Sequence, residues 1–138
     1  MEPAAAFGPG VDTVDHIRLA EELGYTRSWV YDSPALFGDC WMSLAMATTI
    51  GLGTGVLIPS LRHPMVTAAA VAHLAALAPG RVSIGLGTGF TGRFVMGQRP
   101  LTWASTERSI GQIAALLRGE TVEIERELWT FRSVVPQS

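Results

Sequence analysis

Glycine and threonine recur with the same spacing at two places in this chain. The hexapeptide Ile-Gly-Leu-Gly-Thr-Gly occupies Ile50–Gly55 and again Ile84–Gly89, 34 residues further on. Three glycines at alternate positions remove the side chains from one side of a strand end, so a ligand can approach the backbone closely there. Two such strand ends predict the floor of a pocket for a flat ligand. The alternative is that the glycines only relieve crowding between strand and helix.

Two further side chains suited to proton chemistry follow predicted strands. Asp32 ends the strand Ser28–Tyr31, and ligands bind at the carboxyl ends of strands in α/β sheets. An aspartate before Ser-Pro also forms turns, and the sequence leaves these two interpretations equal. His63 follows the next predicted strand and could exchange protons, although a histidine before a helix-initiating proline is more often a cap. The catalytic residues stay unknown, with Asp32 and His63 as the candidates.

The segment Gly87–Gly92 matches the glycine spacing of a dinucleotide-binding loop. That loop needs a helix beginning directly after the strand, so that the helix N-terminus meets the pyrophosphate. Arg93–Pro100 predicts no clean helix, so the match does not indicate a Rossmann site. The chain contains no lysine, which removes the Gly-Lys-Ser/Thr ending of a phosphate-binding loop.

Strands and helices alternate in the pattern that positions these residues. The expected order is an irregular lead-in Met1–Gly10, helix Val11–Leu23, strand Ser28–Tyr31, helix Cys40–Thr48, strand Ile50–Ile58, helix Met65–Leu77, strand Val82–Leu86, loop Phe90–Leu101, helix Trp103–Leu117, and a hairpin of Val122–Ile124 with Leu128–Phe131. Asp12, Asp39 and Thr102 are predicted helix caps. The alternation predicts an α/β fold with a parallel sheet. At 138 residues the chain is expected to be a single domain, 1–138, forming a partial (half) TIM-type (β/α) barrel with a C-terminal β-hairpin.

The composition favours a protein that associates with itself. Hydrophobic residues make up 48% of the chain and charged residues only 16%, below the usual quarter or so. The predicted helix Met65–Leu77 is apolar nearly all round and must be covered on two sides. A homodimer or higher homo-oligomer is therefore expected.

Charge and cysteine usage exclude several other classes. The net charge is −2 and the basic residues are scattered arginines, which argues against a nucleic-acid partner. The longest apolar stretch, Val71–Ala78, is far too short to span a membrane. Met1–Gly10 contains Glu2 and no positive region, unlike a secretory signal. Cys40 is alone, so neither disulfides nor a zinc site is expected, and the predicted location is the cytoplasm.

Several of these segments, in this order, resemble the luciferase-like monooxygenase family. They are Asp32 after its strand, Gly53–Val56 with Arg62–Pro64, and Gly80–Val82 with the second hexapeptide. This bacterial-luciferase superfamily includes the coenzyme F420-dependent reductases and dehydrogenases. Its members are (β/α)8 barrels that bind FMN or F420 at the carboxyl ends of the strands. The resemblance implies a shortened flavin- or F420-dependent oxidoreductase or monooxygenase acting on a small molecule that the sequence does not identify.

The resemblance also implies where a cofactor ring would lie. The matching positions follow the second, third and fourth barrel strands: Asp32, Ser33, Thr54, Gly55, Val56, Thr88 and Gly89. In F420-dependent members a non-proline cis peptide follows the third strand, which here implies Gly55–Val56. Several F420-dependent dehydrogenases carry a histidine where this chain has Ser33.

Two hypotheses for function stay open. In the family, most of the cofactor's phosphate site lies on later strands, to which the resemblance does not extend. The chain is therefore either a shortened cofactor-dependent enzyme, or a non-catalytic half-barrel remnant that folds and oligomerises without binding a redox cofactor.

Overall fold

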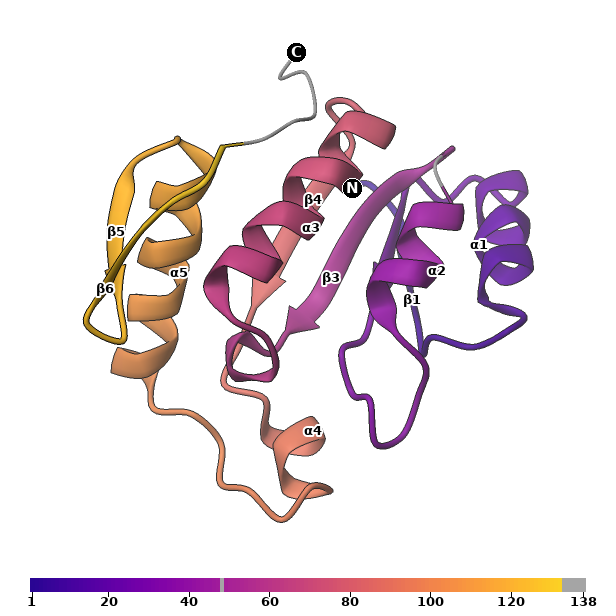
Figure 1. Ribbon diagram of the computed structural model, residues 1–138. Helices are drawn as coiled ribbons and strands as arrows, with labels where there is room; N and C mark the ends of the chain where they lie inside the picture. Colours follow the sequence, from indigo (N-terminus) through magenta and orange to yellow (C-terminus); the bar gives the residue numbers. More distant parts are fainter. Residues whose placement is uncertain (48, 133–138) are drawn as a thin grey trace.

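The structure is a computed structural model that describes residues 1–47 and 49–132. Figure 1 shows its elements. In chain order they are β1 (Ala4–Phe7), α1 (Thr13–Glu22), β2 (Arg27–Val30), α2 (Cys40–Met46), β3 (Gly51–Leu57), the 3-10 helix η1 (Pro59–Leu61), α3 (Pro64–Leu77), β4 (Val82–Leu86), α4 (Phe90–Phe94), α5 (Trp103–Leu117), β5 (Thr121–Ile124) and β6 (Glu127–Thr130).

The main sheet has its strands in sequential order. β1, β2, β3 and β4 are parallel neighbours in that order, and at least one helix follows each strand. This order is that of a (β/α) barrel, whereas the strand order of a Rossmann fold reverses at its centre. The sheet supplies half of the eight strands of such a barrel, and β1 and β4 are its edges. With the antiparallel hairpin of β5 and β6, the predicted fold class is confirmed.

Two segments differ from the sequence-based expectation. The lead-in predicted to be irregular contains β1, although its alanines carry no strand pattern. It forms because its backbone pairs in register with β2, from Ala4 opposite Arg27 to Phe7 opposite Val30, and this pairing outweighs local propensity. The predicted loop after β4 begins with the short helix α4. The strand Val82–Leu86 and the helix Trp103–Leu117 match their predicted bounds, and other boundaries shift by at most two residues. Thr48, the predicted end of α2, lies outside the described residues.

Local capping explains where most helices begin. Asp39 accepts hydrogen bonds from backbone N–H groups in the first turn of α2, and Thr102 does the same for α5. The prediction for Asp12 is wrong, because its backbone is already helical and its carboxylate makes no capping bond. Instead the hydroxyl of Thr13 donates to the carbonyl oxygen of Gly8 at 2.9 Å.

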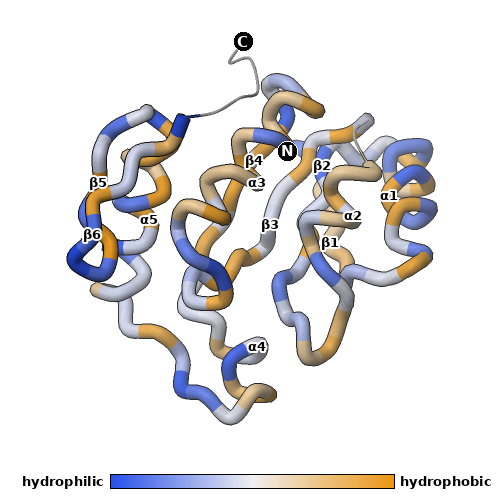
Figure 2. The backbone as a smooth tube through the Cα atoms, viewed as in Figure 1, coloured by the Kyte–Doolittle hydropathy of each residue, from blue (hydrophilic) through white to orange (hydrophobic). Residues whose placement is uncertain are grey.

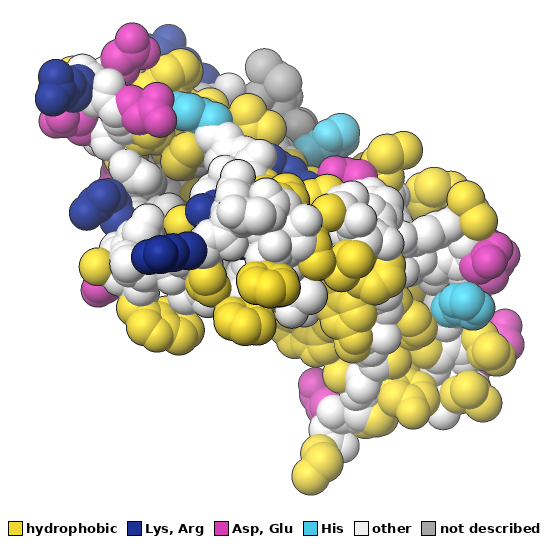
Figure 3. Space-filling model, turned by 90° about the horizontal axis from the view of Figure 1, so that it is seen from below, with side chains coloured by type: hydrophobic (Ala, Val, Ile, Leu, Met, Phe, Trp, Pro, Cys, Tyr) yellow, Lys and Arg dark blue, Asp and Glu magenta, His cyan; other side chains and the backbone are white. Residues whose placement is uncertain are grey.

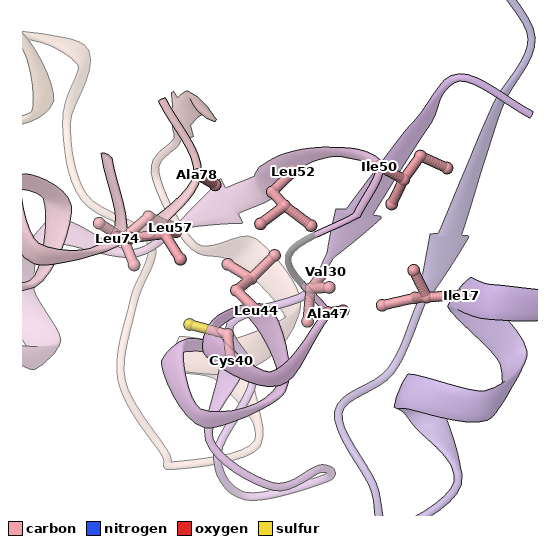
Figure 4. Close-up of a cluster of buried hydrophobic side chains, with 10 residues drawn as sticks. All are labelled: Ile17, Val30, Cys40, Leu44, Ala47, Ile50, Leu52, Leu57, Leu74 and Ala78. Carbon is pink, nitrogen blue, oxygen red and sulfur yellow. The ribbon is translucent and has the colours of Figure 1, made fainter. Parts of the chain in front are cut away.

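The main core lies between one face of the sheet and helices α1, α2 and α3. Strand side chains alternate between faces, so Val30 and Leu52 meet the helices while their neighbours point the other way. Figure 4 shows the buried cluster, which consists of Ile17, Val30, Cys40, Leu44, Ala47, Ile50, Leu52, Leu57, Leu74 and Ala78.

Helix α3 is covered on two sides by its own chain, as its sequence predicted. Leu74 belongs to the main core, whereas Ala68 packs with Leu116 of α5 and Ile124 of β5 in a second core. Figure 2 shows α3 largely in hydrophobic colours, while α1 alternates between hydrophobic and hydrophilic. Neither α3 nor any other helix within the described ranges is long and apolar enough to cross a membrane.

The opposite face of the sheet carries a contact between a cation and an aromatic ring. The strand register places Trp29 beside Gly53, and Gly53 beside Ser83. Arg27 donates from Nη1 to Ser83 Oγ at 2.7 Å, and its guanidinium carbon lies 5.6 Å from the ring centroid of Trp29. Helices α1, α2 and α3 lie on the other side of the sheet (Figure 1), so this face corresponds to the interior of a complete barrel.

Candidate functional site

A pocket of about 680 Å³ opens at the carboxyl ends of β3 and β4. We call it the strand-end pocket. Its floor contains Gly55 and Val56 from β3 and the segment Gly87–Gly89 after β4. Residues after β2 form one wall, and α4 with the start of α5 forms the other. Figure 3 looks onto this end of the molecule, where hydrophobic side chains cover the middle of the surface.

The structure brings together five of the seven residues implied to contact a cofactor. Ser33, Gly55, Val56, Thr88 and Gly89 line the strand-end pocket. The peptide bond between Gly55 and Val56 is cis, as the resemblance implied.

The other two implied residues, Asp32 and Thr54, are not among those that line the pocket. Thr54 is fully buried and donates its hydroxyl to the carbonyl oxygen of Gly85 at 2.9 Å, which ties β3 to β4. Asp32 is 3% exposed. Any role of these two in binding would therefore be indirect, through the strands that they hold.

The glycines of the hexapeptides make room mainly for the protein's own atoms. A Cβ atom at Gly53 would strike the indole of Trp29, and one at Gly87 would lie 2.7 Å from Cγ2 of Val56. A Cβ atom at Gly89 would lie 2.7 Å from Cγ2 of Ile58, in a left-handed backbone with φ +77. The crowding that these glycines relieve thus comes from neighbouring strands rather than from helices. Their backbone still forms the floor of the pocket at Gly55, Gly87 and Gly89.

Asp32 fixes the end of β3 from behind the pocket. Its carboxylate accepts two hydrogen bonds from Arg62, Nη1 to Oδ2 at 2.8 Å and Nη2 to Oδ1 at 3.0 Å. It also accepts the backbone N–H of Ile58 at 3.0 Å. Arg62 reaches on to Asp39, the cap of α2, at 3.3 Å. Asp32 therefore joins the ends of β2 and β3 to the start of α2.

Burial and the charges of this network shift the pKa values of two groups. Burial raises the pKa of the Cys40 thiol to about 12, and the neighbouring Asp32 carboxylate adds to the effect. The thiol lies 3.8 Å from Asp32 Oδ1. Burial alone would lower the pKa of Arg62, but the hydrogen bonds and charge of Asp32 outweigh it and raise that pKa. Arg62 is thus a permanently charged partner, and Cys40 is held as a neutral thiol.

His63 lies outside the strand-end pocket. It is the N-cap of α3, and its Nδ1 accepts the backbone N–H of Met65 at 3.1 Å. Its ring packs on Trp129, with 4.8 Å between the centroids. His63 borders a separate depression beside α5 that also includes Arg108. The structure therefore agrees with the capping interpretation of this histidine.

Sequence reasoning missed the aromatic walls of the pocket. Tyr31 and Phe37 stand on one side with 6.0 Å between their ring centroids. Phe90 is on the other side and stacks on Phe94 at 6.2 Å with an interplanar angle of 7°. Trp103, 76% exposed, adds to this second wall. A usable signal was present, because Tyr31 ends a predicted strand and Phe90 directly follows the second hexapeptide.

The pocket offers hydroxyl groups but no charge. Its polar side chains are the hydroxyls of Tyr31, Ser33, Thr88 and Thr91 and the indole of Trp103, and no Asp, Glu, His, Lys or Arg is among the described residues that line it. A backbone floor between aromatic walls fits a flat ring, whereas a phosphate group finds no cation there. Across the described ranges, no three His, Cys, Asp or Glu side chains gather as a metal site requires.

Comparison with known proteins places the chain in the family that its sequence resembles. The family model described as "Luciferase-like monooxygenase" matches residues 4–138. An F420-dependent glucose-6-phosphate dehydrogenase from Beutenbergia cavernae is 35% identical over 94% of the chain. The match covers 43% of that relative, so the chain spans about two fifths of its length.

Solved structures show the same fold. The F420-dependent tetrahydromethanopterin reductase from Methanopyrus kandleri superposes with a TM-score of 0.74 at 22% identity, over 97% of this chain and 45% of that one. The oxygenating constituent of 3,6-diketocamphane monooxygenase from Pseudomonas putida, solved with FMN, gives 0.76 at 14% identity, over 96% and 44%. At these identities the likeness establishes the fold of the matched half.

Proposed function

Because the chain belongs to the luciferase-like monooxygenase family, we propose that it binds the flat ring of F420 or FMN in the strand-end pocket and serves as an oxidoreductase of that family. The observation that carries this proposal is the floor of glycine backbone at the ends of β3 and β4, where five of the implied residues meet. F420 is the first candidate, because the 35% identical relative is an F420-dependent enzyme. FMN is the second, since the FMN-bound neighbour shares only the fold.

The chain's own residues would bind and orient the ring. Val56, whose side chain is 43% exposed, faces the pocket from β3, and Thr88 faces it from the segment after β4. Hydroxyl groups of Ser33, in the wall, and Thr88, at the floor, supply hydrogen-bond donors and acceptors. The aromatic walls exclude water from a ring placed between them. When bound, the cofactor supplies the hydride or oxygen chemistry, while the protein determines its position and surroundings.

An absorbance titration with F420 and with FMN tests this proposal. Wild-type protein should perturb the absorption band of one of them. Val56→Asp places a carboxylate against the ring and should weaken binding at least tenfold, because a charge facing an apolar surface must be desolvated. Val66→Asp is the matched control, since Val66 is 56% exposed in the first turn of α3 and does not line the pocket.

The same titration decides between the two hypotheses that the sequence left open. If neither cofactor binds at high concentration, the non-catalytic half-barrel is the better description. If one cofactor binds and Val56→Asp does not weaken its binding, the ring lies elsewhere. The assignment of the ring to the strand-end pocket is then wrong. The comparisons reported above match cofactor-dependent enzymes and do not favour the non-catalytic alternative.

We also propose that the protein forms a homo-oligomer. The edges β1 and β4 are unpaired in the described sheet, and open edges favour pairing with another strand. The sheet face that carries Trp29 would be the interior of a complete barrel, and a second copy could cover it. Sedimentation at micromolar concentration should show a species larger than the 14.7 kDa chain. A single species of chain mass would contradict the proposal.

A further inference from the structure

The outer part of the strand-end pocket carries an unusual concentration of exposed apolar side chains. Phe90 and Phe94 are 69% and 70% exposed, although their rings stack on each other. Trp103 is 76% exposed, and Leu36 on the opposite wall is 51% exposed. We call these four residues the apolar rim. Large apolar side chains grouped at a pocket mouth mark a binding site more often than a random surface.

Two arginines on segments next to the pocket bond to other groups of the protein. Arg93, in α4 between the two stacked rings, donates from Nε to the carbonyl oxygen of Arg99 at 2.6 Å and from Nη1 to Ser60. Arg62 is committed to Asp32 and Asp39. A phosphate entering the pocket would therefore lose its hydration without gaining a charged partner among the described lining residues. Figure 3 agrees, because the basic side chains lie toward one side of this face and hydrophobic ones occupy its middle.

Resting on the proposed function, we infer that the substrate is an uncharged molecule with an aromatic or aliphatic body that packs on the apolar rim. A phosphorylated sugar, the substrate class named for the Beutenbergia cavernae relative, would not fit this half of the pocket. The hydroxyls of Tyr31 and Ser33 can form hydrogen bonds with a single neutral polar group on such a molecule. A ring over the strand ends and an apolar molecule against the rim would share the pocket side by side.

Equilibrium binding tests the inference without requiring turnover. The probes are 2-naphthalenemethanol, a neutral bicyclic alcohol, and glucose 6-phosphate, each titrated by calorimetry. The neutral probe should bind at least tenfold more tightly than the sugar phosphate. The double variant F90S/F94S should weaken the neutral probe at least tenfold, and it should fold normally because both side chains are largely exposed. Leu128→Ser is the matched control, since Leu128 is 76% exposed on β6, away from the pocket.

The outcomes separate this inference from the proposed function. The single variant Phe94→Ser should leave the F420 and FMN titrations within twofold of wild type, because Phe94 belongs to the rim and is not among the residues that line the pocket itself. If wild-type protein binds naphthalenemethanol but neither F420 nor FMN, that result rejects the proposed function alone. Equal or tighter binding of glucose 6-phosphate, or unchanged naphthalenemethanol binding in F90S/F94S, would overturn the inference. So would a change of oligomer mass in F90S/F94S, because the rim would then be a contact between copies of the chain.

Discussion

The two copies of Ile-Gly-Leu-Gly-Thr-Gly have the same sequence and different surroundings. In the first copy β3 continues through the hexapeptide to Leu57, so Thr54 is inside the sheet. In the second copy β4 ends at Leu86, so Thr88 lies beyond the strand and lines the pocket. Matching glycines differ as well, since Gly53 lies under the indole of Trp29 and Gly87 under the side chain of Val56. Neighbouring strands, rather than the local sequence, thus decide which copy holds the sheet and which faces a ligand.

The largest expected effect comes from the anchor that only the first copy has. Asp32→Asn removes the charge that faces Arg62, whose side chain is only 17% exposed, and it weakens the bond that fixes Ile58 after β3. Arg62 would keep only its longer contact to Asp39, and a largely buried charge that loses its main partner should lower the free energy of unfolding by about 3 kcal/mol. Urea unfolding measures the change. Asp15→Asn is the control, because the Asp15–Arg18 pair is exposed and should contribute less than about 0.5 kcal/mol.

Equivalent glycines should respond unequally to the same substitution. Gly53→Ala places a methyl group against Trp29 and 2.8 Å from the carbonyl oxygen of Ser83, a backbone atom that cannot move aside. We expect a loss of about 1–3 kcal/mol from overpacking. The methyl group added by Gly87→Ala meets only the half-exposed side chain of Val56, which can rotate. The loss of unfolding free energy should therefore be below about 1 kcal/mol. Equal losses in thermal unfolding would show that the two copies are not distinguished in this way.

The two threonines should separate stability from binding. Thr54→Val removes the buried hydrogen bond to Gly85 and should cost about 1 kcal/mol of unfolding free energy. Thr88→Val should change stability by less than about 0.5 kcal/mol, but it should alter the affinity for the cofactor ring. Denaturant unfolding and the absorbance titration, performed on both variants, provide the two measurements. If Thr54→Val lowers the affinity for the cofactor ring more than Thr88→Val does, the assignment of Thr54 to stability and Thr88 to binding is reversed.

At neutral pH, the smallest effect concerns the Cys40 thiol, which lies behind the first copy. Because the pKa of Cys40 is raised to about 12, the folded protein keeps this proton while the unfolded chain releases it. The unfolded state then binds fewer protons, so stability should fall as pH rises above about 8.5, the ordinary pKa of a cysteine. Cys40→Ala should flatten the curve of unfolding free energy between pH 8 and 10. An unchanged slope in Cys40→Ala would assign the pH dependence to other groups.

Local signals in the sequence predicted the elements better than the site. Asp39 and Thr102 cap helices as expected, because a cap depends on residues within one turn. The alanine strand β1 was missed, since only pairing with β2 makes it a strand. Within the site, spacing alone cannot tell where a strand stops, so Thr54 and Thr88 were predicted to be equivalent. The wall formed by Phe90 and Trp103 depends on α4, which lies in a predicted loop.

The position of α3 between two cores has a consequence for how the molecule opens. The second core, Ala68 with Leu116 and Ile124, joins α5 and the hairpin to the rest of the molecule through α3. A small core should separate at a lower free energy than the larger one, so amide hydrogens of α5, β5 and β6 should exchange with solvent through partial opening. Amides at the centre of β2 and β3 should exchange only when the whole chain unfolds. Trp103 begins α5, so each partial opening would also remove Trp103 from one wall of the strand-end pocket and loosen the hold on a bound molecule.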